Sequence, residues 1–188
     1  MTVLIFAHPY ANRSRANRFL LDAVRDLPGL DVHLLYERYP DFAIDVEAEQ
    51  AALKETDTLI WQHPMHWYSA PSLMKHWFDK VLARGFAYGE GTRALAGKRC
   101  LWATTTGGDE SAFSSTGMHG HSLSRFSTPI EQTARFCGMH WEQPFVLLGA
   151  DRVSERELQR AGQRYRQRIE ELMAGARAPE RARRADLA

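Results

Sequence analysis

The sequence has no long apolar run, no cluster of cysteines and no excess of either charge. No apolar stretch approaches the ~18 residues that a membrane-spanning helix needs. The first seven residues lead into a strand-like segment without the basic and apolar regions of a signal peptide. We therefore expect a soluble, cytoplasmic protein. Lys and Arg number 24 against 23 Asp and Glu, so nucleic acid is not an expected partner and a small ligand is favoured.

Only two cysteines occur, Cys100 and Cys137, and both lie in apolar surroundings without the spacing of a metal site. Two buried thiols are the commoner arrangement for such residues, with a disulfide as the alternative. Free thiols suit a reducing compartment. The length of 188 residues fits one domain with a continuous core.

Three motifs that would assign a common chemistry are missing. The sequence contains no G-x-G-x-x-G, no G-x-x-x-x-G-K-[ST] and no G-x-S-x-G, which disfavours a Rossmann dehydrogenase, an ATP-type phosphate loop and an α/β-hydrolase. His63, His66, His119 and His121 suggest a metal site at first sight. No carboxylate or cysteine stands at ligand spacing from them, so we expect no metal.

Short apolar runs alternate with segments whose apolar residues recur at helical spacing. Strands are predicted over 3–7, 32–36, 58–62, 99–105 and 141–148, and helices over 16–27, 46–55, 71–82, a segment ending near 137, and 154–174. Parallel strands need crossover connections, and helices usually supply them. The pattern predicts one α/β domain over residues 1–175, with a doubly wound parallel sheet of five strands.

Residues 176–188 have no apolar periodicity, and from residue 176 onward four arginines face two acidic residues. We predict a basic, disordered tail. Contact with an acidic partner or a lipid surface is the alternative.

In an open parallel sheet, ligands bind outside the carboxyl ends of the strands, so the loops that follow strands carry the functional information. The first such loop, 8–17, places Ser14 where a helix should begin. The free amides and the dipole of that helix would attract an anion such as a phosphate. The alternative is that Ser14 only caps its helix.

The loop after the third strand, 63–71, ends at Pro71, which suits the first turn of a helix. That helix has an apolar stripe, so Trp77 and Phe78 are predicted to lie in the core. Trp67 and Tyr68 precede the helix and fall outside its stripe. They would suit stacking against a planar ring, although they could also simply hold the loop down.

The loop after the fourth strand is long and rich in glycine, serine, threonine and histidine, which is typical of functional loops. Gly107 and Gly108 would allow its backbone to approach a ligand closely. A glycine pair alone is a weak signal, because most such pairs only make turns.

Five segments in this order give the sequence a specific resemblance. They are "HPYANRSRAN" in the first loop, "HPMHWYSAPSLMKHWFDKV" over 63–81, "GFAYG" over 85–89, "TTGG" over 105–108 and "GMHG" over 117–120. Over roughly residues 3–172 the chain resembles the flavodoxin-like NAD(P)H:quinone oxidoreductases, the group of DT-diaphorase. Within that group it is most similar to the ancillary proteins of glutathione-regulated potassium-efflux systems.

The resemblance implies a flavin site. It assigns the flavin's phosphate and ribityl chain to His8, Ser14, Arg15, Ala16 and Asn17, and the isoalloxazine ring to Met65, His66, Trp67, Tyr68, Thr105, Thr106, Gly107 and Gly108. His119 matches a histidine that supports the reduced flavin and is the catalytic candidate. Phe113 stands where DT-diaphorase has a tyrosine, which puts a Tyr/His proton relay in doubt. The chain lacks the C-terminal extension of DT-diaphorase, so FMN is favoured over FAD.

The resemblance also implies an activity and partners. The chain would be an NAD(P)H dehydrogenase (quinone) that transfers two electrons in a ping-pong cycle, with NAD(P)H as donor and a quinone as acceptor. It would be a homodimer, which the loop aromatics Trp67, Tyr68, Phe86 and Tyr88 also favour. A membrane potassium:proton antiporter is a further expected partner, and this would bring the protein to the inner face of the cell membrane. A regulatory subunit with little turnover and an azo- or nitroreductase remain alternatives, whereas near-zero net charge disfavours a one-electron carrier.

Overall fold

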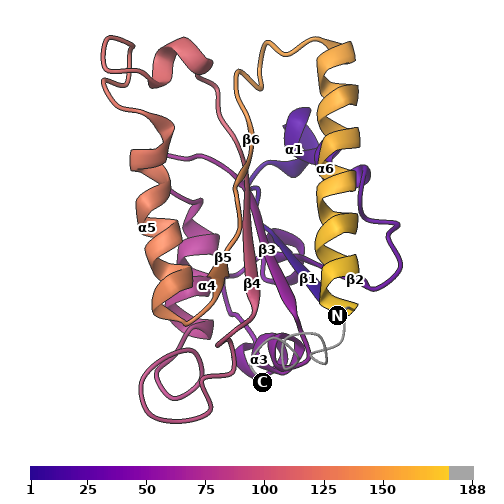
Figure 1. Cartoon of the computed structure of the whole chain (residues 1–188), viewed down its shortest axis with the longest axis vertical. Helices are drawn as coiled ribbons and strands as arrows, with labels where there is room; N and C mark the ends of the chain where they lie inside the picture. The colour runs from indigo at the N-terminus through magenta and orange to yellow at the C-terminus, as the bar shows by residue number, and fades with distance from the viewer. Residues whose placement is uncertain (178–188) are drawn as a thin grey trace, which may run out of the picture.

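The computed structural model describes residues 1–177 and shows one sheet covered by helices on both faces (Figure 1). The strands are β1 (Thr2–Phe6), β2 (Leu30–Leu34), β3 (Thr58–Pro64), β4 (Arg99–Thr105), β5 (His140–Trp141) and β6 (Phe145–Leu147). The helices are α1 (Ala16–Asp22), α2 (Leu35–Arg38), α3 (Val46–Lys54), α4 (Ser72–Val81), α5 (Leu123–Phe136) and α6 (Glu155–Arg177), with short 3₁₀ helices η1 (Ala11–Arg13) and η2 (Glu110–Phe113).

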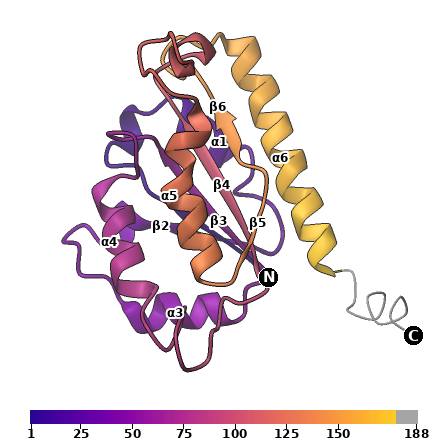
Figure 2. The same cartoon turned by 60° about the vertical axis from the view of Figure 1, so that its left-hand side comes forward.

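The strands are all parallel and run in the order β2-β1-β3-β4-β5, with β6 also paired to β4. This is the order of flavodoxin-type doubly wound sheets. The single α/β domain with a doubly wound parallel sheet is therefore confirmed. Helices α1 and α6 cover one face of the sheet, and α3, α4 and α5 cover the other (Figures 1 and 2).

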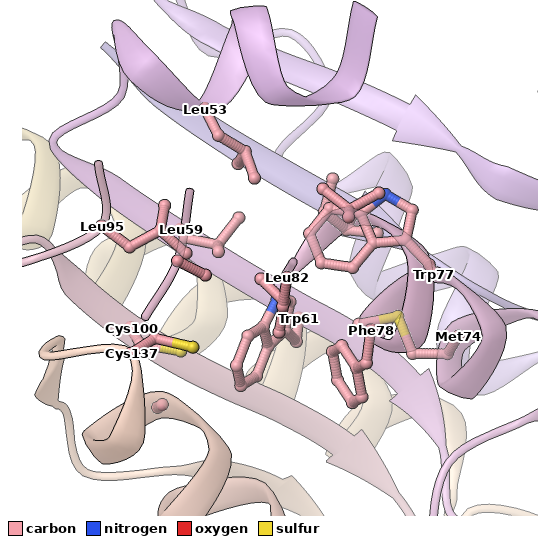
Figure 3. Packing of buried hydrophobic residues seen from close by; sticks show 14 of the residues in the cluster. Leu53, Leu59, Trp61, Met74, Trp77, Phe78, Leu82, Leu95, Cys100 and Cys137 are labelled. Atoms are coloured by element: carbon pink, nitrogen blue, oxygen red, sulfur yellow. The ribbon is translucent and has the colours of Figure 1, made fainter. Parts of the chain in front are cut away.

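The core on the α4 face follows directly from the apolar stripe of that helix. Every residue of β3 is buried, and Trp61 packs against Phe78 with ring centroids 4.7 Å apart. Met74, Trp77 and Phe78 lie together on the side of α4 that faces the sheet (Figure 3). The prediction that Trp77 and Phe78 are core residues is confirmed. Pro71 stands at the N-cap of α4, close to the predicted start.

The two cysteines lie side by side in this core (Figure 3), and both are free. The prediction of two buried thiols is thus confirmed. Burial raises the pKa of the Cys137 thiol to about 11 and that of Cys100 well above its usual value. Neither sulfur is ionised near neutral pH, so neither is a ready nucleophile.

A buried carboxylate joins the edge strand to the helices on this face. Glu49 of α3 accepts hydrogen bonds from Tyr39 Oη (2.8 Å) and Trp77 Nε1 (2.9 Å), and its Oε2 lies 2.8 Å from His33 Nδ1. Arg38 adds a bond of 3.2 Å. Burial alone would raise the pKa of Glu49, but the hydrogen bonds, His33 first, outweigh burial and lower it. The network holds α3, α4 and β2 together around an ionised group.

Two predicted strands and one helix differ from the structure. The strand predicted over 32–36 instead runs from Leu30 to Leu34, because the chain then turns into α2 and buries Leu35 in the core. The strand predicted over 141–148 is divided into β5 and β6, since Pro144 between them has no N–H for the ladder. The helix predicted over 16–27 ends at Asp22 and continues as turns that still bury Val24 and Leu27.

The C-terminal boundary also shifts. Helix α6 continues to Arg177, so residues 176 and 177, which were predicted to begin the tail, are helical. The rest of the predicted tail lies outside the described residues. No helix within residues 1–177 combines the length and the apolar character needed to span a bilayer.

Candidate ligand-binding site

Two adjoining cavities open where the carboxyl ends of the central strands meet. The polar cavity, about 450 Å³, is lined by His8, Tyr10, Arg13, Ser14, Arg15, Ala16, Asn17, Pro64, Met65, His66, Thr105, Thr106, Gly107, Ala150 and Asp151. The aromatic cavity, about 430 Å³, is lined by Met65, Trp67, Tyr68, Thr106, Gly107, Gly108, Ala112, Phe113, Met118, His119 and Arg152. They share Met65, Thr106 and Gly107. Every residue predicted for the site lines one cavity or the other.

The start of α1 differs from its predicted form. Arg15, not Ser14, is the N-cap, and no side-chain hydrogen bond caps the helix. Ser14 instead ends η1 with extended backbone, φ −88° and ψ 116°. The expectation that Ser14 caps α1 is therefore wrong by one residue. Its side chain lines the polar cavity.

Arg15 contacts the beginning of α6. Its guanidinium donates to the carbonyl of Val153 at 2.6 Å and to the carboxylate of Glu155 at 3.2 Å. These bonds link the first loop to the loop between β6 and α6, which lie far apart in sequence. The positive charge of Arg15 thus already has a protein partner, although the residue lines the polar cavity.

The loop between β6 and α6 contributes to both cavities through Ala150, Asp151 and Arg152, none of which was predicted from the sequence. It is fixed to the loop after β4 by backbone bonds from Ala150 N to Thr106 O (2.8 Å) and from Gly149 N to Gly108 O (2.9 Å). A signal for it existed, because the fifth strand of a parallel sheet also ends at this edge.

Asn17 is 2% exposed and holds an unsatisfied acceptor. Its Nδ2 donates to Thr105 Oγ1 at 2.6 Å, and its backbone carbonyl accepts from Gln62 Nε2 at 3.0 Å. Its Oδ1 is buried and has no hydrogen-bond partner within the described part of the chain. A buried polar atom without a partner costs about 1–3 kcal/mol. A ligand that donates a hydrogen bond in the polar cavity would remove this cost.

Strained backbone presents the aromatic pair. Trp67 has φ +48° and Tyr68 φ +63°, a region that bulky residues rarely adopt. His66 and Ser69 exchange backbone bonds of 3.0 and 2.9 Å that close this loop. Trp67 is 93% exposed, whereas Tyr68 is 48% exposed and stacks on Phe126 with centroids 5.2 Å apart. Tyr68 therefore helps to hold the loop down, but Trp67 does not. Such strain in a rim residue is typical of a functional site.

Gly108 lines the aromatic cavity and leaves room for two neighbouring side chains. A Cβ at this position would lie 2.8 Å from His119 Nε2 and 3.1 Å from Phe113 Cε2. The His119 and Phe113 rings pack with centroids 4.5 Å apart. The Nδ1 atom of His119 is buried and has no hydrogen-bond partner among residues 1–177. The glycine thus allows His119 to lie against the loop, beside the aromatic cavity.

His63 and His8 have other surroundings than His119. His63 is completely buried, its Nε2 accepts from Trp102 Nε1 at 3.0 Å, and burial lowers its pKa to about 4. It is a neutral core residue that fixes the end of β3. Burial and the neighbouring His66 lower the pKa of His8. Within the described residues, no group of three or more histidine, cysteine or acidic side chains could hold a metal ion.

The two cavities differ in chemistry. The polar cavity is lined by arginines and by polar groups of the first loop, whereas the aromatic cavity is lined by rings and glycines. The arrangement suits a ligand with an anionic, hydroxylated end and a flat aromatic end.

Comparison with known proteins agrees with this geometry. A family model for the flavodoxin-like fold matches residues 1–169. The glutathione-regulated potassium-efflux system ancillary protein KefF of Klebsiella aerogenes is 47% identical over 169 residues, which cover 90% of this chain and 94% of that protein.

Two solved structures are also similar. General stress protein 14 of Treponema denticola, in complex with FMN, is 34% identical with a TM-score of 0.83, over 92% of this chain and 98% of that one. An NADPH-quinone reductase from P. pentosaceus is 29% identical with a TM-score of 0.81, over 89% and 96%. The chain therefore belongs to the family of proteins with this flavodoxin-like fold.

Proposed function

We propose that this protein binds FMN noncovalently across the two cavities and acts as an NAD(P)H:quinone oxidoreductase. The observation that carries the proposal is the junction of a polar and an aromatic cavity, with one unpartnered buried atom beside each, Asn17 Oδ1 and His119 Nδ1. An FMN-bound structure and an NADPH-quinone reductase among the similar proteins support it.

Different residues would contact the two ends of the cofactor. Ser14 and Asn17 in the polar cavity would face the phosphate and ribityl chain. Trp67, Tyr68 and Gly107 around the aromatic cavity would face the ring. The bound flavin would supply the redox chemistry, taking two electrons from NAD(P)H and passing them to a quinone in a ping-pong cycle.

The protein itself provides stacking and a proton. The exposed face of Trp67 gives planar donors and acceptors a surface next to the aromatic cavity. His119 lines the same cavity and is the candidate proton donor to a quinone bound there. Phe113 packs on His119 but has no hydroxyl group, so a Tyr/His relay is not part of the proposal.

A second role follows from one relative. Similarity to an ancillary protein of a potassium-efflux system favours a regulatory contact with a potassium:proton antiporter at the inner face of the membrane. Turnover would then be secondary to binding. An azo- or nitroreductase activity would use the same site with other acceptors.

We also propose a homodimer. Phe86, one of the aromatics that favoured it, is buried in the core and does not support an interface. Phe136 of α5 is 62% exposed and contacts Tyr88 with ring centroids 5.0 Å apart, beside a groove of about 520 Å³ between α4 and α5. Aromatics at such a surface are common in interfaces. Light scattering at micromolar concentration should give about twice the chain mass of 21.5 kDa; a mass equal to one chain would refute the dimer.

The decisive experiment on function is a spectrum followed by kinetics. Purified protein should be yellow and should release a chromophore of FMN mass on heating. It should oxidise NADH or NADPH with a soluble quinone, and parallel-line kinetics would indicate the ping-pong order. A colourless protein that takes up no added FMN would refute flavin binding. Bound FMN with negligible turnover on quinone, azo and nitro acceptors would favour the regulatory role alone.

A further inference from the structure

We propose that Arg13 is the counter-cation of the FMN phosphate, and that its charge makes the polar cavity select FMN over riboflavin. The proposal rests on FMN being the ligand of this site. Arg13 was not among the residues that the sequence suggested, although it lines the polar cavity from η1.

The first argument is which arginine is free to bind an anion. Arg15 is bound to Val153 O and to Glu155, as described above. Arg18 donates to Asn12 Oδ1 at 3.2 Å and lies 3.8 Å from the carboxylate of Asp22, outside the cavity. Arg13 is exposed, and no ion pair to it is formed by residues 1–177. It is therefore the arginine of this loop whose charge is available.

The second argument is that His8, Asn17 and Asp151, which also line the cavity, do not supply positive charge for a phosphate. His8 Nδ1 already accepts from the amide of Tyr10 at 3.0 Å, and the lowered pKa keeps the ring neutral near pH 7. Asn17 is uncharged, so its amide can bond a ribityl hydroxyl but cannot neutralise a phosphate. Asp151 adds negative charge to the wall.

The third argument concerns α1 itself. This helix has only seven residues and no side-chain cap, so its dipole and its free amides offer limited compensation. A phosphate monoester carries about −1.5 to −2 charge at pH 7. A guanidinium can bind it through two parallel hydrogen bonds with fixed geometry. Arg13 is the group at this end of the cavity that can supply both the charge and that geometry.

The test separates the parts of the ligand. Apoprotein is titrated with FMN, riboflavin and lumiflavin. Riboflavin lacks the phosphate of FMN, and lumiflavin lacks both the phosphate and the ribityl hydroxyls. Binding is followed by quenching of flavin fluorescence. Arg13→Ala should weaken FMN binding about tenfold, a value suited to a charged hydrogen bond at an exposed site, and should leave riboflavin binding unchanged. Its FMN affinity should also depend less steeply on salt than that of wild type.

Matched variants sharpen the result. Arg18→Ala removes a nearby arginine that lies outside the cavity, so all three affinities should stay as in wild type. Arg13→Lys keeps the charge without the bidentate geometry and should recover part of the FMN affinity. Asn17→Ala should weaken FMN and riboflavin equally and leave lumiflavin unchanged.

Three results would overturn the proposal, and each can be told from the others. If wild type binds FMN but Arg13→Ala keeps the same ratio of FMN to riboflavin affinity, the role of Arg13 is refuted while the proposed function stands. An equal loss in Arg18→Ala would also refute it, because the effect would then be general electrostatics. If wild type binds none of the three flavins, both the proposed function and this inference fail.

Discussion

His63 should make the stability of the fold depend on pH between about 6.5 and 4. Its ring is completely buried, and burial lowers its pKa to about 4. In the unfolded chain the same group titrates near 6.5. Between these values the unfolded state binds more protons than the folded state, so stability falls as pH falls. The contribution is complete above pH ~6.5 and is lost as pH approaches the folded pKa.

The size of the effect follows from the shift. A difference of about 2.5 units corresponds to about 3 kcal/mol at 1.36 kcal/mol per unit, and about 2 to 2.5 kcal/mol of it should be lost between pH 7 and 4.5. Glu49 affects stability only at lower pH than His63 does. Its pKa is lowered from 4.5, so the stability that it contributes is lost only below about that pH. The window from 6.5 to 4.5 thus reports mainly on the histidines.

The assay is urea unfolding followed by tryptophan fluorescence at several pH values between 7 and 4.5, for wild type and His63→Gln. The glutamine oxygen replaces Nε2 as acceptor for the indole N–H of Trp102, so that donor stays satisfied. The variant should be less stable at pH 7, because the bond from Nδ1 to the Pro64 carbonyl is lost. Its stability should fall less than that of wild type across the window. Parallel pH profiles for the two proteins would refute the reasoning.

Three further predictions concern the site and the core. Gly108→Val should displace His119 and lower quinone turnover at least tenfold relative to wild type, even at saturating FMN, as measured by steady-state kinetics. Wild-type turnover in this variant would show that the contact between Gly108 and His119 is dispensable. Glu49→Gln should lower the free energy of unfolding by about 3–5 kcal/mol in urea titrations, because a buried ion's hydrogen bonds are broken; a loss under about 1 kcal/mol would contradict this. Cys100 and Cys137 should not react with a thiol reagent until the protein unfolds, since both are buried and protonated; rapid labelling of native protein would count against the packing.

The sequence predicted best those helices and strands in which a whole segment, or one whole face, is buried in the core. All seven residues of β3 are buried, and six of seven in β4, so each strand contains an unbroken apolar segment, 59–61 in β3 and 100–103 in β4. The stripe of α4 repeats at helical spacing because one face packs on the sheet. Burial of this kind acts on each residue locally, so it leaves a pattern along the chain.

Element ends were predicted less well because tertiary contacts decide them. Leu35 continues an apolar run, yet it belongs to α2, which brings Tyr39 within reach of Glu49. That carboxylate lies ten residues further along the chain, and no local pattern announces the pairing. Pro144 did carry a local signal for the break between β5 and β6, since proline removes a ladder donor.

In the candidate site, too, the sequence predicted which residues are present better than it predicted their contacts. The resemblance named many of the residues that line the two cavities, because a ligand constrains which side chains are present, but it missed Arg13 and the loop between β6 and α6. It did not distinguish how each is used. Arg13 and Arg15 are both arginines two positions apart, and only the contact of Arg15 with Glu155 shows that its charge is already compensated. That contact spans 140 residues, so which arginine faces the ligand is a property of the fold and not of the loop. The positive φ of Trp67 is likewise set by the two bonds between His66 and Ser69, which hold an indole in solvent where its own preferences would not place it.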